Sequence, residues 1–476
     1  QDGGYDVEDY YAVDPKFGDM QDLDKLIKVF HDNGIKVVLD LVIGHTSVKH
    51  KWFTESAKGQ RNEYSDYYIW TNSVFDDYPN MIIGLFERDG GYMKNYYASQ
   101  AALNYGFNQT DEKHGWMMRY DDERLRPLRE AVLNVMRFYL DKGVDGFRVD
   151  MASSLVKNGE KFNADKPFDD SDKGLEGIRW LWNKILGTLR REYRDKVYIA
   201  EWVEPQKSIG KCEFDMDFLT HDTLAFNELY RCEPNTNLDS RYEQGRNYFS
   251  REGKGSLKKF VRYVEYLYGR MGDKGCFTAA TGTHDEVRMP TNKSDDLIKT
   301  IFAFLLTLKH IPLIYYGDEI GIGHSFGISK DGGGVRTGAR TPMQWNDEKN
   351  KGFSLSDEIY LPIYNKAGVD VKTQEGKEDS LLNTVKELIK IRKSNNCFSV
   401  SGKQKFYKKG YPCIFTRSDE TSCATVVINP SDRPYRVSKA RIKGKILLSN
   451  NVTQTDKKFI FNGASFLIVK DEISVF

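Results

Sequence analysis

Six short apolar runs that alternate with helical patterns limit what this chain can fold into more than any other feature. The runs cover residues 35–42, 144–150, 196–201, 215–220, 275–281 and 312–316. Around them, apolar residues recur every three or four positions, as an amphipathic helix requires, at residues 19–33, 125–142, 177–193, 258–268, 297–309 and 381–395. Parallel strands need long crossovers, usually helices. The alternation therefore predicts a parallel βα sheet, with residues 35–42 as a buried, nearly continuously apolar strand.

The length of the chain suggests how this sheet closes. A chain of 476 residues suits a (β/α)8 TIM barrel of about 250 residues with insertions and a second unit. Eight strands are two more than the runs provide, and a sheet that lacks two strands has open edges. We therefore expect the first two barrel strands to be absent from this sequence.

Two stretches interrupt the βα pattern. Residues 46–109 contain many Tyr and Trp residues among Gly, Asn and Asp, and a structureless loop of that length is uncommon, which predicts an inserted domain. From residue 397 onward, short β-branched and aromatic runs alternate with turns and predict an antiparallel β domain. The predicted domains are 1–45 (first part of the barrel), 46–109 (inserted domain), 110–396 (rest of the barrel) and 397–476 (C-terminal β domain).

Charge and hydropathy narrow the classes of partner. Lys and Arg number 70 and Asp and Glu 69, so no basic surface points to nucleic acid or to an anionic membrane. No apolar run approaches the roughly 20 residues that span a bilayer. The first residues contain no export signal, so both cytoplasm and periplasm stay open as compartments. The oligomeric state is not indicated.

Cysteine spacing and glycine-rich runs indicate no metal or cofactor. The six cysteines form neither a CxxC pair nor a zinc spacing, and only a Cys413–Cys423 bridge is left open among otherwise scattered buried thiols. The glycine-rich residues 331–334 lack the Lys-Ser/Thr of a phosphate loop, so we interpret them as a flexible rim. The cysteines are Cys212, Cys232, Cys276, Cys397, Cys413 and Cys423.

Three of the predicted strands carry a carboxylate at or near their ends, namely Asp150, Glu201 and Asp285. Strand ends meet at the mouth of a barrel. The two-residue repeat of a strand places Arg148 on the same face as Asp150, where its guanidinium would keep the aspartate ionised. Trp202 beside Glu201 should raise the pKa of that carboxyl, which suits a general acid. This set of groups predicts cleavage of a glycosidic bond.

These strand ends, in the runs 146–151, 198–202 and 282–285, resemble signature regions of the α-amylase family of retaining glycoside hydrolases and glucanotransferases. The upstream run 40–45 resembles the first of that family's four regions, and the likeness extends over nearly the whole chain. The resemblance implies that Asp150 is the nucleophile, Glu201 the acid/base and Asp285 the third carboxylate, which fixes substrate hydroxyls. A retaining mechanism needs the first two carboxylates about 5 to 5.5 Å apart.

The resemblance implies further roles at the same site. Arg148 would orient the nucleophile, and Asp40 would support both of them. His45 and His284 would donate hydrogen bonds to the sugar next to the scissile bond, and Tyr5 would stack under that sugar.

Specificity is indicated by residues 340–345, which are similar to a run of exo-acting α-glucosidases, oligo-α-glucosidases and trehalose-forming relatives. In those relatives an Arg at the position of Arg340 pairs with an Asp, here Asp2, and binds the terminal glucose in a closed pocket. Residues 100–105 resemble another run of this group, with its Pro-Asp replaced. Met151 matches neither the Val of α-1,6-specific relatives nor the smaller or polar residue of α-1,4-specific ones.

Two positions depart from the family pattern. Gly44 replaces an Asn that often helps to bind a structural calcium ion, and Thr283 replaces another Asn. We therefore expect no required metal and no other cofactor.

The sequence thus predicts an enzyme that hydrolyses α-1,4-glucosidic bonds of short maltooligosaccharides from the chain end through a glycosyl-enzyme intermediate. One alternative is a transglycosylase or isomerase such as trehalose synthase, in which a sugar rather than water intercepts the intermediate. The other is a non-catalytic barrel relative that serves as a binding or transporter-associated subunit. The presence of all three acids speaks against this last alternative.

Overall fold

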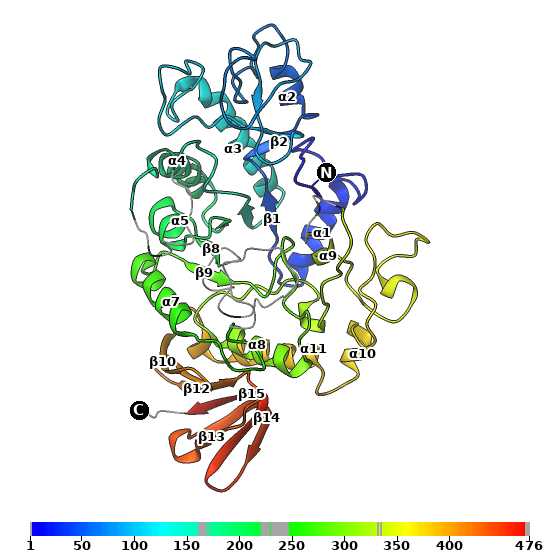
Figure 1. Cartoon of the computed structure of the whole chain (residues 1–476), viewed down its shortest axis with the longest axis vertical. Coiled ribbons are helices and arrows are strands. Elements are labelled where there is room, and N and C mark those ends of the chain that lie inside the picture. Colours follow the sequence, from blue (N-terminus) through cyan, green and yellow to red (C-terminus); the bar gives the residue numbers. More distant parts are fainter. Residues whose placement is uncertain are drawn as a thin grey trace. The chain divides into compact units, whose positions relative to one another are not determined.

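The structure is a computed structural model that describes residues 2–159, 168, 171–219, 229, 247–330, 333 and 336–471. Cys232, the last residue of the predicted strand at 215–220, and residues 331, 332 and 334 of the glycine-rich run lie outside these residues. The chain forms two compact units (Figure 1). Unit 1 contains residues 1–218 and 270–276, and unit 2 contains residues 219–269 and 277–476.

A parallel sheet forms the centre of unit 1. Its strands β1 (Val38–Leu41), β6 (Gly146–Val149), β7 (Val197–Ala200) and β8 (Met216–Leu219) lie side by side in this order. The amide of Cys276, the first residue of β9 (Cys276–Ala279), donates a hydrogen bond of 2.9 Å to the Asp215 carbonyl and continues the order. Each strand lies within one of the predicted runs.

The helices of unit 1 bury the apolar faces that the sequence pattern predicts. In α3 (Arg126–Asp141) and α4 (Glu176–Glu192) the residues at the three-and-four spacing are buried, and each buried Leu, Ile or Val contributes about 1.5–3 kcal/mol. Trp182 of α4 also donates a 2.8 Å hydrogen bond to the Ala152 carbonyl just after β6. These contacts fix the strand ends to the surrounding helices. The remaining helices of this unit are α1 (Met20–Asp32), α2 (Lys51–Ser56), η1 (Glu123–Leu125) and α5 (Pro205–Cys212).

The first strand and helix are less buried than the sequence predicts. Val38 of β1 is 39% exposed, and of the apolar stripe of α1 only Ile27 is fully buried while Leu26 is 44% exposed. The reason is position, because β1 is the end strand of the described sheet and has β6 as its neighbour. The expectation that residues 35–42 form a buried strand is therefore wrong for β1, although its place in the sheet is right.

Residues between β1 and α3 form a small structure of their own. Strand β2 (His45–Ser47) pairs with β5 (Gln100–Ala102), and β3 (Met81–Ile82) pairs with β4 (Tyr92–Met93), all antiparallel. A hydrophobic cluster that includes Ile69, Met93, Ala102, Phe107, Trp116 and Met117 supports them. Two of these residues lie beyond position 109, and the boundaries of the inserted domain stay a prediction.

Unit 2 continues the βα pattern before it ends in an antiparallel sheet. Residues 277–279 of β9 lead to a parallel bridge between Ala280 and Leu313, in the predicted run 312–316. Helix α8 (Asp295–Thr307) is buried from Leu297 to its end and packs against α11 (Leu381–Ser394). The other helical segments are α7 (Lys258–Met271, which ends in unit 1), η2 (Asp318–Ile320), α9 (Arg336–Ala339), η3 (Lys349–Gly352), α10 (Val371–Glu375), η4 (Asn396–Phe398) and η5 (Lys439–Arg441).

The C-terminal sheet, orange to red in Figure 1, has the order β10-β11-β12-β15-β13, with β14 also paired to β15. Phe461, Leu467 and Val427 are among the residues that form its core. The strands are β10 (Lys403–Lys409), β11 (Cys413–Ser418), β12 (Cys423–Asn429), β13 (Tyr435–Ser438), β14 (Lys445–Gln454) and β15 (Lys458–Asp471).

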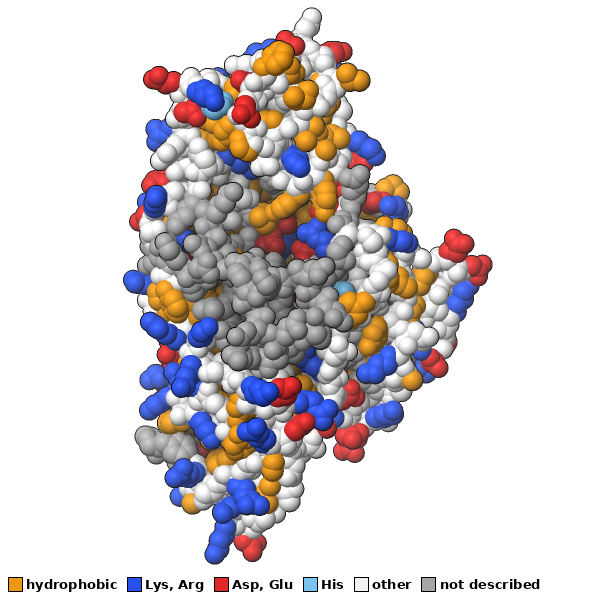
Figure 2. Space-filling view, in the orientation of Figure 1, with side chains coloured by type: hydrophobic (Ala, Val, Ile, Leu, Met, Phe, Trp, Pro, Cys, Tyr) orange, Lys and Arg blue, Asp and Glu red, His pale blue; other side chains and the backbone are white. Residues whose placement is uncertain are grey.

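The structure also locates the cysteines and the charged side chains. Cys413 and Cys423 are free thiols at opposite ends of the β11–β12 ladder, so the bridge left open by the sequence does not form. On the face drawn in Figure 2, acidic and basic side chains are interspersed, as the balanced composition leads one to expect. Among the described residues no helix combines the length and the apolar character needed to cross a bilayer.

Candidate active site

One guanidinium binds three carboxylates at the strand ends of unit 1. Nη1 of Arg148 lies 2.8 Å from Oδ1 of Asp40 and 2.8 Å from Oδ1 of Asp150, and its Nη2 lies 2.8 Å from Oε2 of Glu201. The sheet register explains the arrangement, since Asp40 in β1 is paired with Arg148 in β6 and the next strand, β7, leads into Glu201. The strand repeat brought Arg148 and Asp150 together and the family resemblance implied Asp40 beside them, and the structure adds the contact of Arg148 with Glu201.

Asp150 is held at the end of β6 by backbone and side chain. Its amide donates to the Leu41 carbonyl at 3.0 Å, and its side chain accepts from Arg148. Burial, with only 7% of the residue exposed, raises the pKa of Asp150, and the positive charge of Arg148 opposes that rise. The sequence predicted that Arg148 would keep this carboxyl ionised. Arg148 does lower the pKa of Asp150, as predicted, but burial raises that pKa by more.

Glu201 follows β7 and lies against the turn that follows Asp150. Its Oε2 accepts the Met151 amide at 3.0 Å, and Met151 has the left-handed φ of +46° that aims this amide at the carboxyl. Burial raises the pKa of Glu201 to about 7; Arg148 opposes the rise and the charge of Asp150 adds to it. The raised pKa agrees with the sequence-based expectation of a general acid.

The carboxyl groups of Asp150 and Glu201 are also hydrogen-bonded to each other, which lowers the pKa of Asp150 and raises that of Glu201. Glu201 is therefore the proton donor of the pair. Both carboxyls bind the same guanidinium, one at each terminal nitrogen of Arg148, so they lie close together, as double displacement requires.

Tyr5 lies beside these acids. Its hydroxyl donates to Oδ2 of Asp40 at 2.7 Å, and the Arg148 guanidinium lies 5.9 Å from the centre of its ring. Burial raises the pKa of Tyr5 above its usual value, so the hydroxyl remains a donor. The predicted stacking of Tyr5 under a sugar stays a prediction.

His45 is buried, and both of its ring nitrogens have protein partners. Nε2 lies 2.9 Å from the Tyr5 carbonyl and Nδ1 lies 3.2 Å from Nδ2 of Asn95. Burial lowers the pKa of His45, so the ring is neutral near pH 7. A neutral ring that donates from Nε2 to Tyr5 accepts at Nδ1. In this structure His45 orients Tyr5, and its predicted donation to a sugar stays a prediction.

The residues around Gly44 do not fit a structural calcium ion. The Gly44 carbonyl accepts from Nδ2 of Asn95 at 3.0 Å, and the Lys157 ammonium donates to Oδ1 of Asn95 at 3.1 Å and to the Ser154 carbonyl at 3.0 Å. The oxygens that a calcium ion would need therefore face N–H donors. Burial lowers the pKa of Lys157 to about 8, so at pH 7 this place still holds a positive charge.

Asp2 is buried and receives a hydrogen bond of 3.1 Å from Nε2 of Gln100. Gln100 opens the run at 100–105 that resembles the exo-acting relatives, and the structure now connects it with Asp2. The predicted pairing of Asp2 with Arg340 joins residues of different units and stays a prediction.

The third predicted carboxylate lies in unit 2, among cationic side chains. Oδ1 of Asp285 lies 3.0 Å from Nη2 of Arg340 and 2.9 Å from Nε of Arg336, and its Oδ2 lies 3.5 Å from Nε2 of His284. Nε of Arg340 also donates to the His284 carbonyl at 3.1 Å. Three of the predicted site residues therefore form one cluster.

Several residues of these clusters were missed by the sequence reasoning. Arg336 precedes Arg340 by four residues, one helical turn, and that spacing could have revealed it. The amide of Met151 and the side chains of Asn95 and Lys157 carry no comparable signal, because their contacts come from segments far apart in the chain.

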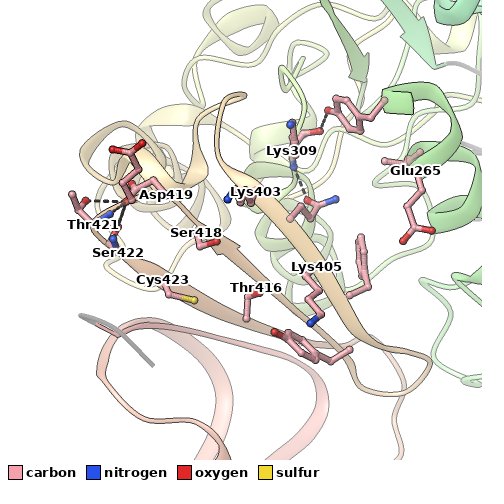
Figure 3. A pocket seen from close by; sticks show the side chains of 16 residues that line it. Glu265, Lys309, Lys403, Lys405, Thr416, Ser418, Asp419, Thr421, Ser422 and Cys423 are labelled. Carbon is pink, nitrogen blue, oxygen red and sulfur yellow. Dashed lines mark hydrogen bonds between the residues drawn. The ribbon is translucent and has the colours of Figure 1, made fainter. Parts of the chain in front are cut away.

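A separate hollow of about 830 Å³ lies in unit 2 between α7 and the strands β10 and β11 (Figure 3). Lysines cover two of its aromatic rings, with Lys309 over Tyr268 and Lys405 over Tyr407. The Asp419 carboxylate accepts from the Thr421 and Ser422 amides of its own turn. The charged groups of this hollow thus bind one another, and Arg148, Asp150 and Glu201 are not among its lining residues.

The structure thus places two carboxyls together at the ends of neighbouring parallel strands, and such a pair of acids is what a glycoside hydrolase uses. The comparisons with known proteins agree. Residues 1–401 match the model of the alpha amylase catalytic domain. The chain belongs to the α-amylase family, and its barrel with a C-terminal antiparallel sheet is the predicted fold.

The relatives include enzymes of more than one activity. The chain is 27% identical over 438 residues to the trehalose synthase/amylase TreS of Mycolicibacterium smegmatis, covering 84% of this chain and 68% of that protein. It is 26% identical over 507 residues to an oligo-1,6-glucosidase of Heyndrickxia coagulans, covering 94% and 86%. Among solved structures, an inactive double mutant of MutB in complex with isomaltulose superposes with a TM-score of 0.79 at 21% identity, covering 98% of this chain and 89% of that one. At 21% identity, the similarity to this MutB structure shows the fold alone.

Proposed function

We propose that the protein hydrolyses α-1,4-glucosidic bonds of short maltooligosaccharides from the chain end, with retention of configuration. The observation that carries the proposal is the contact of Asp150 and Glu201 with each other and with the two terminal nitrogens of Arg148. The protein is a retaining glycosidase of a family that needs no cofactor for catalysis. The roles of its residues, its substrate and its product are the proposed part.

In the first step Asp150 attacks the anomeric carbon while Glu201 gives its proton to the leaving glycosidic oxygen. The groups suit these roles because Glu201 is the proton donor of the pair and Asp150 receives the charge of Arg148. The products of this step are a glycosyl ester on Asp150 and the shortened sugar. The anomeric carbon is inverted in this ester, and a second inversion in the next step restores its original configuration.

In the second step Glu201, now ionised, takes a proton from water, and the water attacks the same carbon and releases Asp150. The Met151 amide and Arg148 hold the Glu201 carboxylate in both steps. Asp40 and Tyr5 complete the hydrogen bonds around Arg148 and keep its guanidinium in place.

Asp285 is proposed to bind sugar hydroxyls as the third carboxylate. Its two arginine partners hold it at a fixed orientation, which is what a group that binds a distorted ring requires. Arg340 and Asp2 are proposed to bind the terminal glucose, and His284 and His45 to contact the adjoining sugar.

A second function, sugar transfer, is favoured by one observation, the similarity to the trehalose synthase/amylase TreS. It uses the same glycosyl-enzyme and differs in the acceptor. The non-catalytic alternative finds no support, because the chain belongs to a family of enzymes and holds the complete acid pair.

The product profile tests the proposal. Purified protein is incubated separately with maltose, maltoheptaose, isomaltose and trehalose, and the products are separated by chromatography. We expect glucose from maltose and stepwise release of glucose from maltoheptaose. Trehalose formed from maltose would show that the enzyme transfers glucose rather than hydrolysing the bond. Glucose released mainly from isomaltose would contradict the α-1,4 preference. Early products of maltoheptaose between maltose and maltopentaose, in place of glucose and maltohexaose, would contradict attack from the chain end.

A further inference from the structure

Asp217 is a buried carboxylate that the mechanism above does not use. It lies in β8 with none of its surface exposed, and four backbone amides and one hydroxyl point at it. Its Oδ1 accepts from the amides of Trp202 at 3.1 Å, Val203 at 3.0 Å and Phe218 at 2.7 Å. Its Oδ2 accepts from the Glu204 amide at 3.1 Å and from Oγ of Ser208 at 2.6 Å.

Three of these amides belong to the segment that directly follows Glu201. Trp202, Val203 and Glu204 connect the end of β7 with the start of α5, and the register pairs Ala200 with Asp217. One side chain on the neighbouring strand therefore binds three consecutive amides of the connecting segment. The oxygens of this carboxyl replace the backbone partners that a loop at a strand end lacks. Burial raises the pKa of Asp217 to about 7, and its hydrogen bonds from Ser208 and from the backbone amides oppose that rise.

The segment needs such an anchor because its backbone is strained. Val203 has a φ of +63°, a left-handed conformation that β-branched residues rarely adopt. Strain of this kind persists only where the surrounding contacts over-determine it. The bond from the Val203 amide to Asp217 is such a contact, and the buried ion pair of Glu204 with Lys207 at 2.8 Å anchors the other end.

Glu201 is tied on both sides. Its carbonyl accepts the Ala152 amide at 3.1 Å and its amide donates to the Val149 carbonyl at 3.0 Å, while the residues after it depend on Asp217. Ser208, which also binds Asp217, lies in the second turn of α5, so the same carboxylate ties the helix to the strand. Loss of the carboxylate would release the backbone directly after Glu201 and leave the contacts of Arg148 with Asp40 and Asp150 in place.

We propose that Asp217 is a positioning residue that keeps the carboxyl of Glu201 where it can protonate the leaving oxygen. The inference rests on the proposed role of Glu201 as the acid/base. Asp217 does not touch the reacting atoms, and its effect passes through the backbone of residues 202–204. A purely structural role of Asp217 would instead lower activity on every substrate alike.

The leaving group separates these two roles. A dinitrophenolate departs without a proton, whereas phenol needs one from Glu201, so an error in the position of the acid slows only the second reaction. We compare kcat/KM, which reports the first step, for 2,4-dinitrophenyl and phenyl α-glucosides. The variants are Asp217→Asn, which keeps the shape of the side chain but turns an NH2 group toward the backbone amides, Glu201→Gln as the reference and Ser208→Ala as the milder change.

For Glu201→Gln we expect a loss of about 100-fold or more on the phenyl glucoside and a loss several times smaller on the dinitrophenyl glucoside. For Asp217→Asn we also expect kcat/KM to fall more on the phenyl glucoside than on the dinitrophenyl glucoside, with a fall of about tenfold on the phenyl glucoside. Equal losses of Asp217→Asn on both substrates, with Glu201→Gln selective, would overturn the inference alone. Equal losses in Glu201→Gln would overturn the proposed acid/base and the inference with it.

The milder variant keeps the inference testable if Asp217→Asn yields no folded protein. Ser208→Ala removes the shortest of the five bonds and leaves all backbone donors in place. We expect a loss of about twofold to threefold on the phenyl glucoside only, which corresponds to a small displacement of the acid. No loss, or an equal loss on both substrates, would overturn the inference.

Discussion

The two carboxylate clusters of the molecule have opposite charge balance. In unit 1 three carboxylates, those of Asp40, Asp150 and Glu201, share the single guanidinium of Arg148. In unit 2 one carboxylate, that of Asp285, has two guanidiniums, those of Arg336 and Arg340. The first cluster has an excess of negative charge and the second an excess of positive charge.

This difference decides which cluster can hold a proton. An excess of buried carboxylates is relieved when one of them stays protonated, and in unit 1 that one is Glu201. In unit 2 the Asp285 carboxylate is held between Arg336 and Arg340, an arrangement that suits a fixed acceptor. The proton for the glycosidic oxygen is therefore expected from unit 1, and hydrogen bonds to sugar hydroxyls from unit 2.

The largest expected effect comes from Asp150→Asn. The change removes the nucleophile and leaves the carboxylate of Asp40 to balance Arg148, so we expect at least about a 1,000-fold loss of kcat on maltose. The thermal midpoint, measured by calorimetry, should stay within a few degrees of the wild type. As a matched control, Asp9→Asn changes an exposed aspartate of the same unit and should leave kcat unchanged. Wild-type-like turnover in Asp150→Asn would break the assignment.

The dependence of kcat/KM on pH tests whether Glu201 is the group that donates the proton. A general acid must be protonated, so kcat/KM for maltose should fall by about tenfold per unit as the pH rises above the pKa of about 7. Ionisation of Asp150 is required as well, and because burial raises its pKa the activity should also fall toward low pH. In Glu201→Gln, assayed on a dinitrophenyl glucoside, the alkaline fall should disappear. Its persistence would mean that another group gives the alkaline limb.

A smaller effect is expected in unit 2, where two arginines can be compared. Arg340→Ala should raise KM for maltotriose by about tenfold, because a charge-assisted bond to a neutral sugar or to Asp285 contributes about 1.5–3 kcal/mol. Arg336→Ala removes the other partner of Asp285 and serves as the matched variant. A terminal-glucose pocket requires that Arg340→Ala have the larger effect on KM. Equal effects would indicate that both arginines act only through Asp285.

The smallest effect is expected from metal removal. The Lys157 ammonium and the Asn95 amide already bind the oxygens near Gly44, so a chelator has no calcium to take from this place. Dialysis against EDTA should therefore leave kcat and the thermal midpoint unchanged within about a degree. A fall of either one that added calcium restores would contradict this reading of the site.

Local sequence patterns predicted the elements well where one face of a helix or strand is buried. Helix α4 matches its predicted range to within one residue and strands β6 and β7 lie within theirs, because each buries the stripe that its own periodicity defines. Strand β1 was predicted as buried and is partly exposed, since burial depends on what lies beside a strand and not on its own apolar residues. The composition of residues 35–42 could not contain that information.

For the site, too, contacts within one strand could be predicted from the sequence and contacts between strands could not. Arg148 and Asp150 are two residues apart in one strand, so their contact followed from the strand repeat alone. The contacts of Arg148 with Glu201 and Asp40 depend on the register of neighbouring strands, and those of Asp217 depend on a loop that returns to its neighbour. No local spacing contains these contacts.

The sequence by itself determined the family, the βα order and the identity of the acids, because periodicity and short motifs are local properties of the chain. Only the tertiary structure showed that burial raises the pKa of both carboxyls, that Arg148 opposes both rises, and that the charge of Asp150 adds to the rise at Glu201. These shifts follow from burial and from charges contributed by several strands, and both arise only when segments far apart in the sequence come together.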